Sequence, residues 1–224
     1  MSLNFNKNLK HTFVGISLAS NSGNETGIAI LDKDLKIISL DKAFTMNDLS
    51  FFFDNFVSKK NSIIMVSMTE DATMLNSKWK VLAKKFQMLQ PYEDNFPNRQ
   101  NWLLKYSPRA TDLISKYKNE GIDIFRFDII DLKKSLGLYG TYKHRSPADC
   151  KYLQSALKIK FKLEGIVNNM LPASQLEAIL GAIFAKEIYD GTCGKNYEVL
   201  TSFKNVEILK LKETHFNDIE PCCK

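Results

Sequence analysis

The residues of this sequence with the clearest chemical character are cationic side chains interleaved with aromatic ones. Between Lys78 and Lys118 there are nine basic residues against three acidic ones, so this stretch alone carries a net charge of +6. Seven aromatic residues lie in the same stretch. Ammonium and guanidinium groups bind phosphates, and flat rings stack on bases, which favours a nucleic-acid-binding surface. The alternative is that the lysines lie on solvated helix faces while the rings fill a core.

A second basic run extends from Lys143 to Lys162, with six basic residues against Asp149 alone. Nucleic acid is therefore a possible partner of this chain. The candidate nucleic-acid-binding residues from the two runs are Lys78, Lys80, Lys84, Lys85, Arg99, Lys105, Lys143 and Arg145.

The overall composition is that of an ordinary globular protein. The chain has 224 residues, of which 44% are hydrophobic and 25% charged. The four cysteines form no C-x-x-C pair and the three histidines are scattered, which argues against a zinc site. No apolar run approaches the roughly 20 residues that cross a bilayer, and the polar N-terminus does not resemble a secretory signal. We expect a cytoplasmic protein without membrane contact, and an oligomer is possible.

The first part of the chain predicts three strands in an antiparallel meander. The apolar segments 13–18, 27–32 and 35–40 are separated by short polar turns. A helix capped by Asn47 or Asp48 and running to about residue 60 follows, and then a buried strand over 62–68. A crossover helix between strands favours a parallel addition to the meander.

The remainder of the chain alternates helices and strands. Helices are predicted over 74–90, 109–120, 147–165 and 172–190, a fifth strand over 122–127, and short strands between 197 and 211. The predicted fold class is α/β, with a mixed sheet of a three-strand antiparallel meander plus parallel strands and helices on both faces. We expect residues 12–211 to form a single domain, with a flexible N-terminus (1–11) and a loose C-terminal tail (212–224).

Several segments together resemble the RNase H-like superfamily, in particular a bacterial group of predicted nucleases known as domain-of-unknown-function family 429. They cover roughly residues 12 to 191. In chain order, the segments are FVGISLAS, TGIAILD, SIIMVSMT, RATDLI, GIDIFRF, YKHR, YLQSAL and SQLEAILGAIFA.

The resemblance implies a cluster of carboxylates that holds two Mg²⁺ or Mn²⁺ ions for phosphodiester hydrolysis. This chain departs from that pattern, because Ser17 and Ser67 stand where the family has aspartates on the first and fourth strands. The helix position is Glu177, the candidate metal ligand, while Arg109 and Asp112 match the family's R-x-x-D signature. Serine hydroxyls are neutral and poor Mg²⁺ ligands, so the implied site is degenerate.

Other chemistries are open at these positions. The two serines could act as nucleophiles, and His144 is the only candidate histidine that could activate one. Because His144 lies in a basic run, a surface histidine without a catalytic role is the favoured interpretation. Arg109 and Asp112 are either a helix ion pair or a phosphate clamp. Glu177 is either a satisfied polar residue at the edge of the sheet or a remnant metal ligand.

Three functions follow from these observations. The favoured one is a catalytically degenerate nuclease homologue that binds nucleic acid or a partner protein without cutting. The second is a nuclease that needs Mg²⁺ or Mn²⁺, with Glu177, Asp112 and Arg109 as catalytic residues and Glu70 or Asp71 as further ligands. The third is a non-catalytic protein-interaction module. The opening hairpin also resembles that of the actin and sugar-kinase ATPase fold, but one domain is too short for that architecture.

Overall fold

The structure is a computed structural model, and it describes residues 11–19, 23–57, 61–68, 108–139, 142–190, 197–203 and 206–211. The helix predicted over 74–90 lies outside these residues, and so do Glu70 and Asp71. Six of the eight candidate nucleic-acid-binding residues also lie outside them: Lys78, Lys80, Lys84, Lys85, Arg99 and Lys105. Almost all of the two predicted terminal segments lies outside them too, so their predicted flexibility is untested.

Seven strands form one mixed sheet in the order β3-β2-β1-β4-β5-β7-β6. The first three are antiparallel neighbours, whereas β1, β4, β5 and β7 pair in parallel and β6 is antiparallel to β7. The strands are β1 (Thr12–Leu18), β2 (Thr26–Leu31), β3 (Ile37–Ala43), β4 (Ser62–Met68), β5 (Asp123–Phe127), β6 (Tyr197–Phe203) and β7 (Val206–Leu211).

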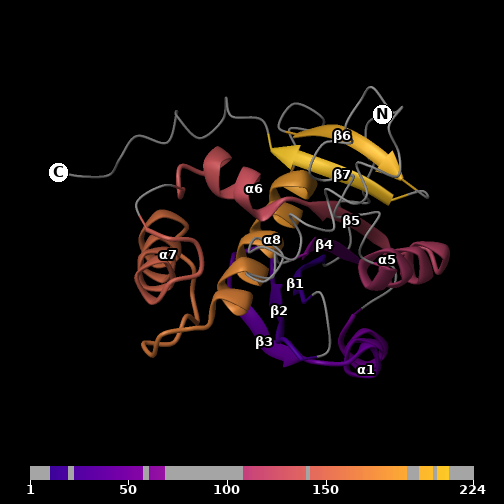
Figure 1. Cartoon of the computed structure of the whole chain (residues 1–224), viewed down its shortest axis with the longest axis horizontal. Helices are drawn as coiled ribbons and strands as arrows, with labels where there is room; N and C mark the ends of the chain where they lie inside the picture. Colours follow the sequence, from indigo (N-terminus) through magenta and orange to yellow (C-terminus); the bar gives the residue numbers. More distant parts are fainter. Residues whose placement is uncertain are drawn as a thin grey trace, which may run out of the picture.

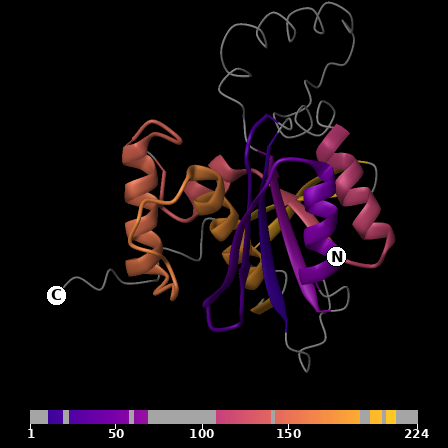
Figure 2. The same cartoon turned by 90° about the horizontal axis from the view of Figure 1, so that it is seen from below.

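Helices cover both faces of this sheet. Figure 2 shows α7 and α8 on one side and α1 and α5 on the other, and Figure 1 shows α8 crossing the middle of the sheet. None of the helices in the described ranges could span a bilayer. This arrangement confirms the predicted α/β fold class, with a mixed sheet of an antiparallel three-strand meander plus parallel strands and helices on both faces. The helices are α1 (Met46–Phe56), α5 (Pro108–Asn119), α6 (Ile129–Ser135), α7 (Pro147–Lys160) and α8 (Ala173–Asp190).

The sheet separates two hydrophobic cores, and the side chains of β1 point alternately into one and the other. Phe13 points into the core shared with α6, α7 and α8. Val14, Ile16 and Leu18 point into the core shared with α1 and α5. Because both faces are covered, the central strands are continuous apolar runs, and the polar residue Ser17 is an exception on the α8 face.

Helix α8 packs on the sheet backbone itself at two glycines. A Cβ atom at Gly15 would lie 1.8 Å from the carbonyl oxygen of Ala178, and one at Gly27 would lie 2.2 Å from that of Ser174. Only glycine permits so close an approach. This contact fixes the height of α8 over β1 and therefore the position of its polar side chain, Glu177.

Four elements differ from the sequence prediction. Strand β3 spans Ile37–Ala43 rather than 35–40, because Leu35 has a left-handed φ of +60° in the turn before it. Thr45, rather than Asn47 or Asp48, caps α1, and Asp48 is the third residue of a capping box. Helix α7 ends at Lys160 instead of near 165, because Lys162 has a left-handed φ of +49° and the Leu163 N–H donates back to the Leu157 carbonyl at 3.3 Å. Helix α6 was not predicted, and it begins immediately after β5 at the N-cap Asp128.

Candidate functional site

The carboxyl ends of the central parallel strands lie beneath α8. Ser17 of β1 and Ser67 of β4 are register partners, and neither side chain is exposed to solvent. Glu177 of α8 is also fully buried, and its Oε2 atom accepts a hydrogen bond of 2.8 Å from the Ser17 hydroxyl. The Ser67 hydroxyl has no hydrogen-bond partner among the described residues. The structure thus brings together the three residues that the resemblance mapped onto the family's acidic positions.

Arg145 holds the Glu177 carboxylate in a bidentate ion pair. Its Nε atom donates to Oε1 and its Nη2 atom to Oε2, each at 3.0 Å. The Arg145 backbone has a φ of +62°, a left-handed conformation that costs a non-glycine residue about 1–2 kcal/mol. In this conformation its N–H donates to Asp149 Oδ2 at 2.8 Å. Both ends of Arg145 are therefore fixed, which explains why the strained backbone persists.

The start of α7 positions Arg145 and Asp149 together. Ser146 is the N-cap, and its hydroxyl accepts a hydrogen bond of 3.2 Å from the Asp149 N–H, while Pro147 occupies the first helical position. The Asp149 carboxylate lies in the first turn, where the helix dipole favours a negative charge. The sequence RSPAD therefore builds this corner locally.

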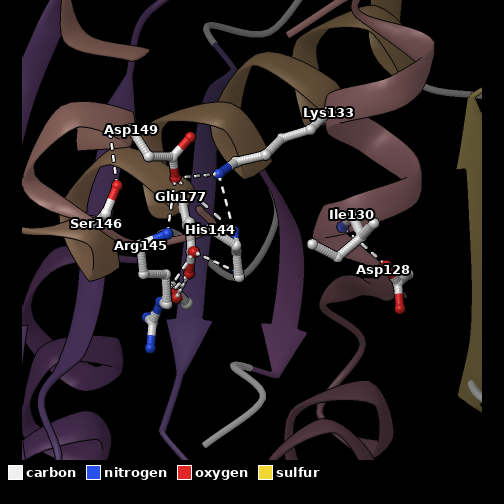
Figure 3. A network of polar contacts seen from close by, with 9 residues as sticks. Asp128, Ile130, Lys133, His144, Arg145, Ser146, Asp149 and Glu177 are labelled. Atoms are coloured by element: carbon white, nitrogen blue, oxygen red, sulfur yellow. Dashed lines mark hydrogen bonds and ion pairs between the residues drawn. The ribbon is translucent and has the colours of Figure 1, made fainter. Parts of the chain in front are cut away.

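Lys133 of α6 is the second cation of the site. Only 2% of its side chain is exposed, whereas 28% of the Arg145 side chain is. Its Nζ atom lies 3.0 Å from Asp149 Oδ2 and 3.1 Å from His144 Nδ1. The His144 Nε2 atom lies 3.5 Å from Glu177 Oε1, so the imidazole lies between the two ion pairs (Figure 3). The buried network consists of Ser17, Lys133, His144, Arg145, Asp149 and Glu177.

The geometry assigns the proton of His144. An ammonium group only donates, so Nδ1 accepts from Lys133 and the ring proton lies on Nε2, facing Glu177. Burial lowers the pKa of His144 below its ordinary 6.5; Glu177 and Asp149 oppose this shift, while Lys133 and Arg145 add to it. His144 is therefore neutral at pH 7, and it is part of the buried network rather than the surface histidine that the sequence favoured.

A second polar cluster borders the network at the N-terminus of α8. The Ser174 hydroxyl donates to Glu25, and Lys42 of β3 lies 2.9 Å from the same carboxylate. Burial raises the pKa of Glu25, but the hydrogen bonds from Lys42 and Ser174 outweigh it, so the pKa lies below its ordinary value. Glu25 is therefore charged and already paired.

These residues do not fit the two Mg²⁺ or Mn²⁺ ions that the family resemblance implies. Arg145, His144 and Ser17 occupy both oxygens of Glu177. Within the network, the charges of Arg145 and Lys133 balance those of Glu177 and Asp149. No group of three or more metal-ligating side chains is found in the described parts of the chain. A divalent cation at this position would be surrounded by ion pairs whose charges cancel and by neutral hydroxyls. Hard cations need anionic oxygens, so these residues do not suit one.

The remaining predicted site residues are placed as follows. Arg145 lies in the network, whereas Lys143, two residues earlier, is exposed. Arg109 and Asp112 lie on α5, which packs against the face of the sheet opposite α8, and their side chains are outside the described set. The predicted roles of these four residues are untested by the geometry.

Sequence reasoning missed Lys133, Asp149 and Glu25. The segment SPAD carried a readable signal, because serine, proline and an acidic residue in this order mark a helix start. Nothing local connected Asp149 to Lys133, since their contact depends on α6 lying beside α7. Glu25 was read as part of a turn, and its pairing depends on the position of α8.

Comparisons with known proteins give one distant likeness to report. No family model and no curated protein matches the chain. Among solved structures, the chain is similar to T. thermophilus RuvC in complex with Holliday junction substrate, with a TM-score of 0.45 and 11% sequence identity. The alignment covers 81% of this chain and 98% of the RuvC chain.

The ion pair makes a quantitative prediction for stability. Arg145→Met leaves the Glu177 carboxylate buried without its cation, so we expect the free energy of unfolding at pH 7 to fall by about 3–5 kcal/mol. Adding Glu177→Gln removes the stranded charge, so the double variant should be more stable than Arg145→Met alone. Urea denaturation measures both. The matched control is Lys186→Met, which removes a pair to the half-exposed Asp190 on α8 and should cost less than about 1 kcal/mol. Equal losses for Arg145→Met and Lys186→Met would contradict the assignment.

The neutral His144 predicts a pH dependence. Because its pKa in the folded state lies below the 6.5 of the unfolded chain, the unfolded state binds the proton first as the pH falls. The contribution of His144 to the free energy of unfolding should therefore be constant above pH 6.5 and fall as the pH drops below it. His144→Gln, which can still accept from Lys133 and donate to Glu177, should lack this part of the decline. Denaturation between pH 7.5 and about 5.5 compares the two proteins, and parallel curves would refute the prediction.

Proposed function

We propose that this protein is an RNase H-like nuclease homologue that does not hydrolyse phosphodiesters and that binds nucleic acid. The observation that carries the first part is the bidentate ion pair between Arg145 and Glu177. The observation that supports the second is the excess of cations in residues 129–162, the segment that supplies most of the network. We also propose that the chain is a divergent member of the predicted-nuclease group that its sequence resembles.

The loss of hydrolysis follows from charge. Two-metal hydrolysis needs carboxylates that hold two divalent ions between enzyme and phosphate. Here the guanidinium of Arg145 supplies the positive charge at Glu177, and a metal ion would have to displace a cation that is bonded to the same two oxygens. Ser17 and Ser67 offer no compensating negative charge. The network stabilises the edge of the sheet in place of the metals.

The serines have no route to nucleophilic chemistry either. The Ser17 hydroxyl donates to Glu177, whose charge Arg145 already balances, so this carboxylate is a poor base. His144 accepts from Lys133 at Nδ1 and presents its Nε2 proton to Glu177, so neither ring nitrogen is free to take a proton from a hydroxyl. Binding without chemistry is the function that this geometry supports.

Binding to nucleic acid is supported by electrostatics. The chain carries a net charge of +6, and residues 129–162, which supply four of the six network residues, contain eight basic residues against Asp131 and Asp149. Lys133 and Arg145 neutralise buried carboxylates, which leaves exposed cations such as Lys143 for phosphates. The untested candidate cations between Lys78 and Lys105 would add to the same attraction.

A cleavage assay tests the loss of hydrolysis. Labelled single- and double-stranded DNA, RNA and hybrid are incubated with the protein in Mg²⁺ or Mn²⁺. We expect no cleavage above that of a Glu177→Gln control, because neither protein holds the metals. Metal-dependent cleavage that disappears in Glu177→Gln would overturn the proposal in favour of a nuclease with a rearranged acidic site.

The same substrates then test binding. Phosphate contacts release counterions, so the affinity should fall steeply as the salt concentration rises. A binding constant that does not change with salt, or the lack of any binding, would favour a protein-interaction module instead.

A further inference from the structure

Three tyrosines beside the buried network present their rings to solvent. Tyr139 is 53% exposed, Tyr142 is 48% exposed and Tyr152 is 37% exposed. Tyr139 follows α6, Tyr142 lies in the loop that leads to Arg145, and Tyr152 lies on α7. Large aromatic rings are normally buried, and an exposed group of them marks an interaction surface.

Two of the rings are in contact, and the third is close to them along the chain. The centroids of Tyr142 and Tyr152 are 6.0 Å apart, with ring planes tilted by 53°, so the loop ring rests beside the helix ring. Only two residues separate Tyr139 from Tyr142, which limits their Cα separation to roughly 11 Å. The Nζ atom of Lys134 lies 5.3 Å from the centroid of the Tyr139 ring, a cation–π contact that places a positive charge at this surface.

One lysine contacts a ring of this group, and two more are sequence neighbours of the other rings. Lys134 contacts Tyr139, while Lys143 and Lys151 directly adjoin Tyr142 and Tyr152 in the sequence, and all three lysines are exposed. The nearest acidic residue of α7, Asp149, is buried against Lys133. The surface is therefore positive and aromatic, which is complementary to a polyanion with accessible base faces.

We propose that this tyrosine surface (Tyr139, Tyr142, Tyr152, Lys134, Lys143 and Lys151) binds single-stranded nucleic acid. The inference rests on the proposed function and specifies its ligand class. The tyrosine rings stack on unpaired bases, and the lysines contact the phosphates between them. In a duplex the base faces are stacked on one another, so a surface that works through ring faces selects single strands.

The same chemistry indicates binding without sequence preference. Every base has a π-face, so stacking tolerates any sequence. The lysines are point charges that bind phosphate wherever it lies along the strand, whereas base discrimination needs bidentate donors and acceptors. Arg145, the nearest guanidinium, is engaged by Glu177 and does not supply that readout.

Fluorescence anisotropy with labelled oligo-dT, oligo-U and a blunt DNA duplex of the same length tests this inference. We expect tighter binding of both single strands than of the duplex. Tyr142→Ala and Tyr152→Ala should each weaken single-strand binding by at least about fivefold, the low end of base–aromatic stacking. Tyr142→Phe keeps the ring and should retain the affinity. Phe51→Ala is the matched control, because Phe51 is an exposed ring (66%) on α1, across the sheet, and should leave binding unchanged.

The outcomes separate this inference from the proposed function. If the wild-type protein binds nucleic acid but prefers the duplex, or if both alanine variants bind like Phe51→Ala, the tyrosine surface is overturned while nucleic-acid binding stands. If the wild-type protein binds none of the three probes, the proposed function and this inference fail together. Tighter binding of oligo-U than of oligo-dT by the wild-type protein, with both affinities reduced in the alanine variants, would support the surface and favour RNA as its strand.

Discussion

The carboxylate of Glu177 has no access to solvent, and the polar contacts at this edge of the sheet depend on balancing its charge. A buried charge without a partner is far more costly than a typical protein tolerates, so the fold must deliver a cation to it. Arg145 does so with two hydrogen bonds, at the cost of a left-handed backbone. Asp149 then holds the Arg145 backbone, and Lys133 balances the charge of Asp149. Each of these contacts balances the charge or supports the backbone conformation of the residue before it.

The sheet makes this chain of contacts possible. The glycines beneath α8 let the helix backbone rest on β1 and β2, which lowers Glu177 onto the end of β1. The carboxyl ends of parallel strands lie at one edge of the sheet. Ser17, near the end of β1, and the start of α6, directly after β5, therefore lie at the same edge. An edge with these topological features suits a ligand site. In this chain a guanidinium and an ammonium provide the positive charge there, and the neighbouring tyrosines and lysines face outward.

The sequence predicted the periodic elements well and the polar contacts poorly. The apolar run over 62–68 matched β4 residue for residue, because a buried strand between turn signals is a strong local pattern. The resemblance placed Ser17, Ser67 and Glu177 in one site. The ion pair of Arg145 with Glu177 was not predicted, and neither was the seven-residue α6 that carries Lys133. Ion pairs between residues far apart in the chain depend on tertiary packing, which no local pattern encodes.

A guanidinium, rather than a metal ion, supplies the positive charge at Glu177, and NMR can observe this directly. The Arg145 Nε–H donates to a buried carboxylate, so its proton should give a resolved, slowly exchanging signal. We expect that signal to be unchanged when Mg²⁺, a diamagnetic ion, is added in excess. Loss of the signal on adding Mg²⁺, with the other arginine signals unchanged, would show that a metal ion displaces Arg145 from Glu177 and would contradict this assignment.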